Sequence, residues 1–280
     1  MSWASQLDAR QRAMLAEMGV QVWTPEGQAT VAAKAPLSPP AAPSPRAPSV
    51  RPQMSAAPEP APAPAPAPAP MVPAAMPDDT RADQIAVMDW SELQASVAGC
   101  QACGLCKTRR NTVFGVGDRQ ADWMIIGEAP GENEDRQGEP FVGVAGQLLD
   151  RMLQATGHRR DGADGQGAYI ANVLKCRPPA NRNPQPEEVV RCEPYLVRQV
   201  ALVRPKVILA MGRFAVQSIL RTDEPIGRLR ERVHRYQGVP VIVTYHPAYL
   251  LRNPADKVKS WADLCLAMDT ANTPLAADGP

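Results

Sequence analysis

The sequence predicts an α/β protein in which helices cover both faces of a four-stranded, mainly parallel sheet, a three-layer α/β/α arrangement. Short apolar runs typical of buried strands alternate with amphipathic helical patterns, and this alternation favours a parallel sheet. A Pro- and Ala-rich stretch ahead of these elements predicts a disordered N-terminal tether. The expected strands cover residues 123–126, 169–174, 207–211 and 239–245.

The helices between these strands have recognisable boundaries. Asp89, with Glu92 three residues later, has the pattern of a capping box at the start of a helix that runs into Cys100. Pro186 occupies the favoured first-turn position of a helix that extends to about Val203. Further helical patterns cover residues 145–157, 213–220 and 256–268.

Composition divides the chain into four parts: a short N-terminal segment (1–25), a linker (26–88), a folded domain (89–270) and a tail (271–280) expected to be disordered. The linker contains alternating Ala and Pro at 61–70 and has too little apolar surface to offset the entropy of ordering, so disorder and partial polyproline II structure are expected. The chain has no secretory signal and no apolar run of membrane-spanning length, which predicts a cytoplasmic protein without membrane contact.

The charge of the chain is nearly balanced, with a formal net charge of +1 that gives no overall signature of nucleic-acid binding. Basic residues cluster locally beside glycine- or proline-broken loops, which favours contact with nucleic acid, although solvated basic faces are common. The clusters are Lys107, Arg109 and Arg110; Lys175, Arg177 and Arg182; and Arg228, Arg230, Arg232 and Arg235.

The stretch from Trp123 to Gly143 combines a buried strand, a glycine–proline turn, three acids, a lone phenylalanine and the start of a helix. Polar residues also follow the predicted strands, with Glu128, Asn172 and His246 at their carboxyl ends. Because ligands bind beyond the carboxyl ends of strands in open α/β sheets, these residues predict one cleft.

The chain has six cysteines, and without an export signal a disulfide framework is not expected. Cys100, Cys103 and Cys106 form C-x2-C-x2-C directly after a predicted helix, a spacing typical of metal or iron–sulfur ligands. A tetrathiolate site needs two more ligands, which Cys176 and Cys192 could supply. The spacing does not separate zinc from a four-iron cluster. Cys265, on the last amphipathic helix, is expected to be an unpaired core thiol.

Taken together, these segments resemble the family 4 uracil-DNA glycosylases, which are iron–sulfur DNA-repair enzymes. The matching region runs from about Asp89 to Met268. The motifs that carry the resemblance are C-Q-A-C (100–103), F-G-V-G (114–117), G-E-A-P-G-E-N-E-D (127–135), G-E-P-F-V-G-V-A-G-Q-L-L (138–149), N-V-L-K-C-R-P-P (172–179), Asn181-Arg182, Cys192 and H-P-A-Y-L-L-R-N-P (246–254).

The resemblance implies a glycosylase that flips uracil out of DNA and hydrolyses its N-glycosidic bond, leaving an abasic site. Its partner would be uracil-containing DNA, and a monomer is expected. It also implies a [4Fe-4S] cluster held by Cys100, Cys103, Cys176 and Cys192, with Cys106 left out. In the family this cluster has a structural or DNA-sensing role rather than a catalytic one.

The substrate-binding residues fit this chemistry. Phe141 could stack on the flipped base, although a core phenylalanine is the alternative. The amide of Asn172 matches O4 and N3–H of uracil, whereas cytosine would leave buried polar groups unpaired. By family position Glu134 crowds C5 and excludes the methyl group of thymine. Backbone N–H groups of the turn that contains Ala129 and Gly131 could add donors.

The catalytic residues predicted from the same motifs are Glu128, Asn181 and His246. His246 could donate to O2 of the departing uracil as negative charge develops. Either Glu128 or Asn181 could position the attacking water, and the sequence does not decide between them. The alternatives to uracil excision are a glycosylase for another deaminated base such as hypoxanthine, a non-catalytic nucleic-acid-binding relative, and a zinc-bound structural module.

Residues 12–25 form a separate pattern, a short amphipathic helix followed by an extended segment that ends at Trp23. Too few residues are present to bury its apolar side chains, which favours a partner-binding peptide on a tether. The segment is similar to the N-terminal part of the clamp-loader psi subunit that binds chi, which predicts a replisome partner. A helix that folds back onto the catalytic domain is the equally weighted alternative.

Overall fold

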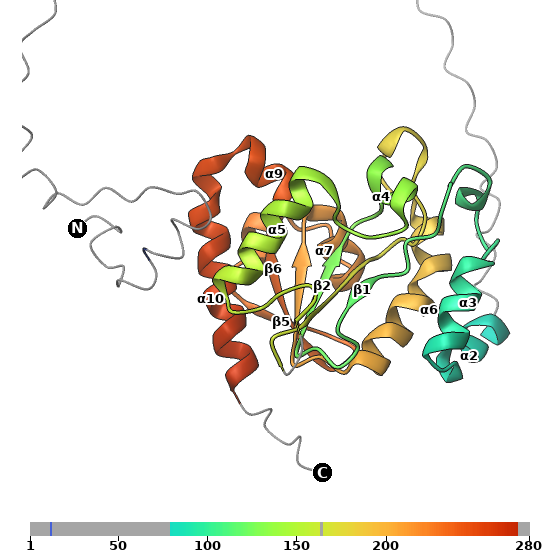
Figure 1. The fold of residues 1–280 in the computed structure, drawn as a ribbon, viewed down its shortest axis with the longest axis horizontal. Helices are drawn as coiled ribbons and strands as arrows, with labels where there is room; N and C mark the ends of the chain where they lie inside the picture. Colours follow the sequence, from blue (N-terminus) through green and yellow to red (C-terminus); the bar gives the residue numbers. More distant parts are fainter. Residues whose placement is uncertain (1–11, 13–78, 163–164, 274–280) are drawn as a thin grey trace, which may run out of the picture. The chain divides into compact units, whose positions relative to one another are not determined.

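The computed structural model describes Arg12 and residues 79–162 and 165–273. The predicted N-terminal peptide (apart from Arg12), the tether up to residue 78 and the tail from residue 274 therefore lie outside the described residues. The strands are β1 (Val116–Gly117), β2 (Trp123–Gly127), β3 (Ala168–Asn172), β4 (Val207–Met211), β5 (Val233–Tyr236) and β6 (Val239–Thr244). They form one sheet in the order β1-β3-β2-β4-β6-β5, with helices on both faces (Figure 1).

The helices that surround this sheet vary from one turn to five. The α-helices are α2 (Asp79–Val87), α3 (Trp90–Ala98), α4 (Glu132–Gln137), α5 (Gly143–Ala155), α6 (Pro186–Val203), α7 (Arg213–Leu220), α8 (Ile226–Leu229), α9 (Pro247–Arg252) and α10 (Lys257–Asn272). Short 3-10 turns occur at η3 (Gly104–Lys107), η4 (Pro179–Asn181) and η5 (Pro254–Asp256). None of the helices described is both long and apolar enough to cross a membrane.

The predicted α/β class is confirmed, and each of the four predicted strands is present as β2, β3, β4 or β6. These four pair in parallel in the centre of the sheet. The predicted number of strands is wrong, because β1 and β5 add antiparallel edges. β1 has only two residues, and β5 (V-H-R-Y) carries exposed and polar side chains. Neither therefore has the apolar run that identifies a buried strand.

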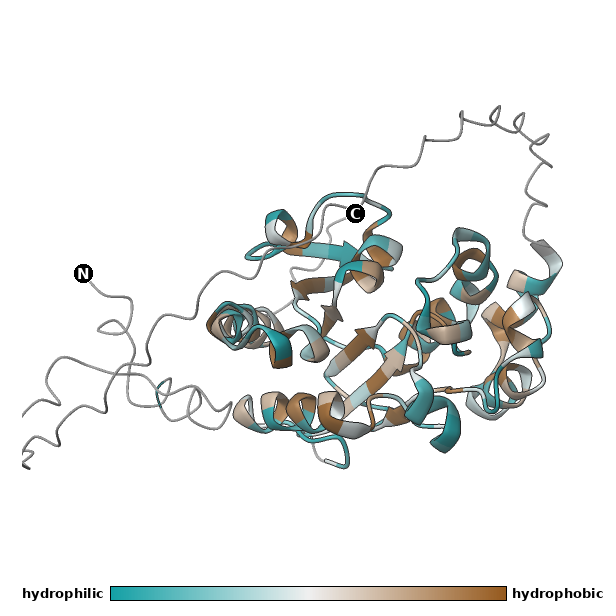
Figure 2. Ribbon diagram, turned by 90° about the horizontal axis from the view of Figure 1, so that it is seen from above, coloured by the Kyte–Doolittle hydropathy of each residue, from teal (hydrophilic) through white to brown (hydrophobic). Residues whose placement is uncertain are grey.

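The central strands are buried on both faces, as parallel sheets between helices usually are. Trp123 and Ile125 of β2 point into a core formed with α5 and α10. Met124 and Ile126 alternate with them and point into a second core formed with α6 and α7. Figure 2 shows apolar residues concentrated in these strands and on the helix sides that cover them. The alternation explains why each strand is apolar throughout.

Local signals place the helix ends. The Glu92 backbone N–H donates to Asp89 Oδ1 at 2.8 Å, and the Asp89 N–H donates to Glu92 Oε2 at 2.8 Å, which completes the predicted capping box of α3. Pro186 is the first residue of α6, as predicted. The acids after the glycine turn form α4, because carboxylates stabilise the first turn of a helix.

Helix α2 occupies residues 79–87, inside the range predicted as linker, and α10 continues to Asn272, beyond the predicted start of the tail. The side chain of Ile85 is 1% exposed and belongs to a small core formed with α3 and α6. Arg81 Nη1 donates to the carbonyl oxygen of Arg191 at 2.9 Å. These contacts attach α2 to α6.

Candidate active site and thiol cluster

Three parallel strands carry the predicted polar residues to one edge of the sheet. Glu128 directly follows β2, Asn172 ends β3, and His246 follows β6 by two residues. The register pairs Gly127 with Asn172, which sets the first two side by side. A cleft of about 270 Å³ opens at this edge. Its lining includes five of the predicted site residues, namely Glu128, Ala129, Gly131, Asn181 and His246.

Asn172 and Phe141 lie behind this cleft rather than on its open wall. The side chains are 2% and 6% exposed, respectively. Both approach Gly127 closely, since a Cβ placed there would lie 2.5 Å from Asn172 Oδ1 and 2.5 Å from Phe141 Cζ. The missing side chain at Gly127 therefore lets the amide and the aromatic ring meet.

The loop that carries Phe141 is fixed by charged side chains. Phe141 has φ +53°, an unusual conformation for an aromatic residue. Arg160 holds the loop from one side by donating to the carbonyl oxygens of Pro140 at 2.8 Å and Phe141 at 2.9 Å. On the other side of the loop, Glu134 Oε1 accepts a hydrogen bond from the Val142 N–H at 3.0 Å. The position of the phenyl ring is thus set by its own loop and not only by packing.

His246 is held in one tautomer by the start of α9. Its Nδ1 accepts from the Ala248 N–H at 3.1 Å, so the ring proton belongs on Nε2. Burial lowers the pKa of His246 to about 4, with the positive charge of Arg252 acting in the same direction. The ring stacks on Phe141 with centroids 5.3 Å apart and planes at 23°. His246 is therefore a neutral donor at physiological pH.

The two candidates for positioning water differ in their contacts. Burial raises the pKa of Glu128 to about 7. In the described part of the chain, its carboxylate makes no hydrogen bond or ion pair, which leaves both oxygens available in the cleft. Asn181 is exposed, and its Oδ1 accepts from Arg177 Nε at 2.7 Å. The only side-chain acceptor of Asn181 is thus already engaged.

Tyr249 and Arg252 also line the cleft, although the sequence pattern did not single them out. They lie three and six residues after His246 in the motif at 246–254, on the helix that His246 caps. Helical spacing was the signal that could have identified them, since Tyr249 lies three residues after His246 and Arg252 lies three residues after Tyr249. Arg252 brings a positive charge to the cleft.

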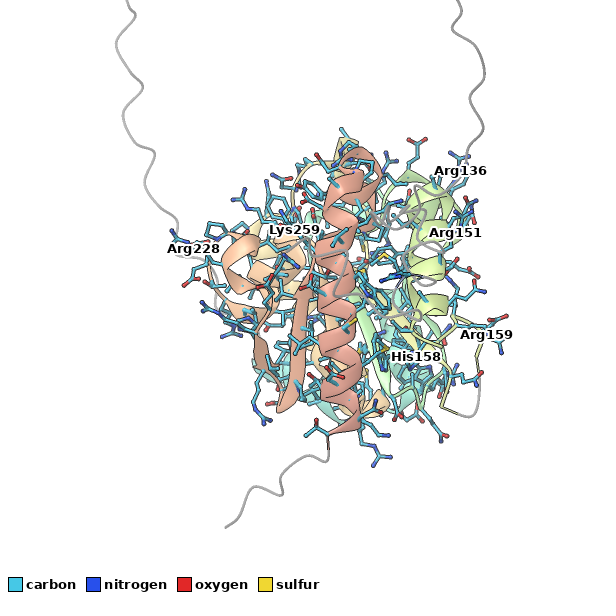
Figure 3. All side chains as sticks on the ribbon, turned by 90° about the vertical axis from the view of Figure 1, so that its left-hand side faces the viewer. Arg136, Arg151, His158, Arg159, Arg228 and Lys259 are labelled. Atoms are coloured by element: carbon cyan, nitrogen blue, oxygen red, sulfur yellow. The ribbon has the colours of Figure 1, made fainter. Side chains whose placement is uncertain are left out.

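The predicted basic clusters are not all on the surface. Lys175 is 1% exposed, and Arg230 is buried in an ion pair with Asp263, with Nε 2.7 Å from Oδ2. These two predictions of surface charge are wrong, because long-range packing covers both side chains. Of the arginines labelled in Figure 3, Arg228 belongs to a predicted cluster and lies on one side of the molecule, whereas Arg136, Arg151 and Arg159, which belong to none, lie along the other.

The cysteines form a second feature, beside α3 and α6. A small cavity is lined by five thiols, those of Cys100, Cys103, Cys106, Cys176 and Cys192. The four predicted ligands therefore come together, and Cys106 shares their cavity. Cys265, on α10, packs against a different core. Within the residues described, no three His, Cys, Asp or Glu side chains are grouped tightly enough for a single metal ion.

Donors surround these sulfur atoms. Arg109 Nη1 lies 3.2 Å from Cys176 Sγ, and the Lys175 N–H donates to Cys192 Sγ at 3.3 Å. Burial raises the pKa of Cys192 to about 12 and also raises that of Cys176, so these thiols ionise readily only with a metal or nearby cations. A cavity ringed by sulfur atoms and by N–H donors fits a thiolate-bound cluster, whose potential and stability depend on such donors.

A larger groove of about 1000 Å³ runs between α2, α6 and α7. Its lining is mainly apolar and includes none of the predicted site residues. The smaller cleft is the better candidate site, because convergent polar groups and a shifted pKa, rather than volume, indicate chemistry.

Comparison with known proteins identifies the family of this chain. A family model described as the uracil DNA glycosylase superfamily matches residues 114–265, which include all the predicted catalytic and substrate-binding residues. The chain is 46% identical to the type-4 uracil-DNA glycosylase of Archaeoglobus fulgidus over 171 residues, covering 58% of this chain and 83% of the relative. It is 41% identical to the type-4 uracil-DNA glycosylase of Pyrobaculum aerophilum over 187 residues, which cover 64% of this chain and 93% of the relative. It is 43% identical to the type-4 uracil-DNA glycosylase of Saccharolobus solfataricus over 166 residues, which cover 56% of this chain and 75% of the relative.

Proposed function

The chain belongs to the uracil DNA glycosylase superfamily, and we propose that it excises uracil from DNA by hydrolysing the N-glycosidic bond, which releases free uracil and leaves an abasic site. The observation that carries this proposal is the convergence of Glu128, Asn172 and His246 at one edge of the sheet, inside the region that matches the superfamily.

Uracil is recognised by the buried amide of Asn172 after it has been flipped out of the duplex. The amide N–H donates to O4 and the amide oxygen accepts from N3–H, so cytosine presents the opposite pattern. Phe141 and the side-chain amide of Asn172 both lie close to Gly127, and the phenyl ring supplies an aromatic face for the base. Glu134 holds the backbone next to Phe141. By its position in the family motif, Glu134 limits the room at C5 of the base.

Bond cleavage leaves negative charge on the uracil ring and positive charge on the sugar. Neutral His246 donates from Nε2 to O2 of the departing base, and its fixed tautomer means that no reorientation is needed. Glu128 positions the attacking water, because its carboxylate is unengaged whereas the acceptor of Asn181 is bound to Arg177. A pKa of about 7 leaves a substantial fraction of Glu128 ionised at neutral pH.

The direct test is uracil release from a labelled oligonucleotide by the full chain. We expect release from uracil-containing strands and none from matched strands that carry thymine or cytosine. A strand with hypoxanthine separates uracil excision from repair of other deaminated bases. Binding of all these strands without release of any base would instead identify a non-catalytic relative.

Cys100, Cys103, Cys176 and Cys192 hold a [4Fe-4S] cluster in this proposal. The support is that all four cysteines line one cavity, as the ligands of a shared thiolate-bound cluster must. When bound, the cluster would cross-link the segment after α3, the segment after β3 and helix α6.

We expect Cys176→Ala or Cys192→Ala to lose the cluster and much of the thermal stability, because metal binding by ligands far apart in sequence is coupled to folding. Cys106→Ala and Cys265→Ala are the matched controls and should keep both. Iron content, visible absorbance and thermal unfolding of the purified variants measure the outcome. Colour retained in Cys192→Ala but lost in Cys106→Ala would show that a different set of four cysteines binds.

For the N-terminal segment we propose a replisome partner, the clamp-loader chi subunit, bound through residues 12–25. The support is the sequence pattern alone, in which an apolar segment that ends at Trp23 precedes the long Pro- and Ala-rich stretch. A peptide of residues 1–27 should capture chi in a pull-down, and Trp23→Ala should abolish capture. Equal capture by both peptides, or none by either, removes the proposal and leaves the enzymatic activity unaffected.

A further inference from the structure

The side chain of Lys175 is one of the most completely buried in the chain, at 1% exposed, and the proposed reaction does not use it. Its Nζ donates to the carbonyl oxygen of Asn172 at 2.8 Å and to Gln199 Oε1 at 2.6 Å. Gln199 is itself held, since its Nε2 donates to the carbonyl oxygen of Phe114 at 2.9 Å and to Tyr169 Oη at 3.1 Å. The ammonium is therefore fixed in one position.

The charge of this ammonium has no carboxylate partner within ion-pair distance in the described ranges. Desolvating an ammonium is costly unless an opposite charge lies nearby. The next residue in the chain, Cys176, and the sulfur atom of Cys192 both line the thiol cavity. Lys175 also contacts that cavity through its backbone, whose N–H donates to Cys192 Sγ at 3.3 Å.

Asn172, which binds the base in the proposed function, lies on the same short segment as Lys175. Between Asn172 and Cys176 the chain is attached to the end of β2, because the Val173 N–H donates to the Gly127 carbonyl at 2.9 Å and the Leu174 N–H to that of Glu128 at 3.1 Å. Lys175 adds the third attachment, from its side chain back to Asn172. Base recognition and thiol ligation thus share one short piece of backbone.

We propose that Lys175 is a positioning residue that couples the two sites: its buried ammonium balances the negative charge of the thiolate-bound cluster and, from the same position, fixes the backbone of Asn172. This inference rests on the proposed function and on the proposed cluster. Because Lys175 lies below the surface and donates to protein groups, it makes no contact with DNA phosphate.

The first test replaces Lys175 by Met, which keeps the length of the side chain and removes the charge. A positive neighbour stabilises the reduced, more negative cluster, so Lys175→Met should shift the midpoint potential of the bound cluster to a more negative value. The single-turnover rate of uracil excision should fall by roughly tenfold or more, with DNA affinity unchanged, because a charge-assisted hydrogen bond to Asn172 is lost. Lys206→Met is the matched control, since Lys206 is exposed and pairs with Asp122 at 2.7 Å.

A second pair of variants decides the question if Lys175→Met does not fold or retain iron. Gln199→Glu places a carboxylate against the ammonium and neutralises it, whereas Gln199→Met removes the same hydrogen bond without adding charge. We expect a more negative midpoint potential in Gln199→Glu than in Gln199→Met. Equal potentials in this pair, or a wild-type potential in iron-loaded Lys175→Met, would overturn the coupling. A wild-type protein that holds no iron and releases no uracil would refute the proposed function instead.

Discussion

Asn172→Asp is expected to reduce the single-turnover rate of uracil excision by about a thousandfold while leaving DNA affinity nearly unchanged. The substitution keeps the shape of the side chain but replaces the amide donor to O4 by an oxygen that repels it. The position is 2% exposed, so the new carboxylate would be buried beside Phe141, at a cost of about 3–5 kcal/mol.

The measurement is a single-turnover excision assay alongside a binding assay with the same duplex. Asn272→Asp serves as the control, since it makes the same chemical change at an exposed residue at the end of α10. Phosphate contacts supply most of the affinity and are untouched by either variant. Near-wild-type excision by Asn172→Asp would remove Asn172 from base recognition.

His246→Ala is expected to slow the chemical step by roughly 100- to 1000-fold, the usual cost of removing one donor from a site that stabilises a developing anion. Affinity for uracil-containing DNA should change little, because the donor matters most once charge has built up on the leaving base. The loss of rate should not depend on pH near neutrality, because the imidazole of His246, with a pKa of about 4, stays neutral there.

His234→Ala is a suitable control for this experiment. His234 lies on the edge strand β5, where its Nε2 lies 2.7 Å from the carbonyl oxygen of Leu229, and it does not line the cleft. Rapid-quench measurements under single-turnover conditions separate the chemical step from product release. If His246→Ala weakened binding and left the chemical step intact, His246 would position the substrate and play no part in departure of the base.

The cleft shows how much of the candidate site could be predicted from residue patterns in the sequence. Glu128, Asn172 and His246 were placed at strand ends from apolar runs and breaks alone, and parallel pairing brings such ends to one edge. The choice between Glu128 and Asn181 was beyond the sequence, because it depends on the hydrogen bond between Asn181 and Arg177. The donor nitrogen of His246 likewise depends on how the first turn of α9 is oriented.

Local patterns were sufficient for most of the secondary structure, since capping, helical periodicity and buried apolar runs act between residues close in sequence. The short and partly polar strands β1 and β5 were missed because edge pairing, rather than their own composition, makes them strands.

The location of charge was set by contacts between distant parts of the chain. Lys175 belongs to a basic cluster in the sequence, yet α6 brings Gln199 and Cys192 over it and turns a surface cation into a buried one. Cys106 resembles its neighbouring cysteines in spacing, and folding places it in the same cavity. Periodicity reports which face of an element is apolar, whereas burial of a particular charge depends on the partner that packs against it.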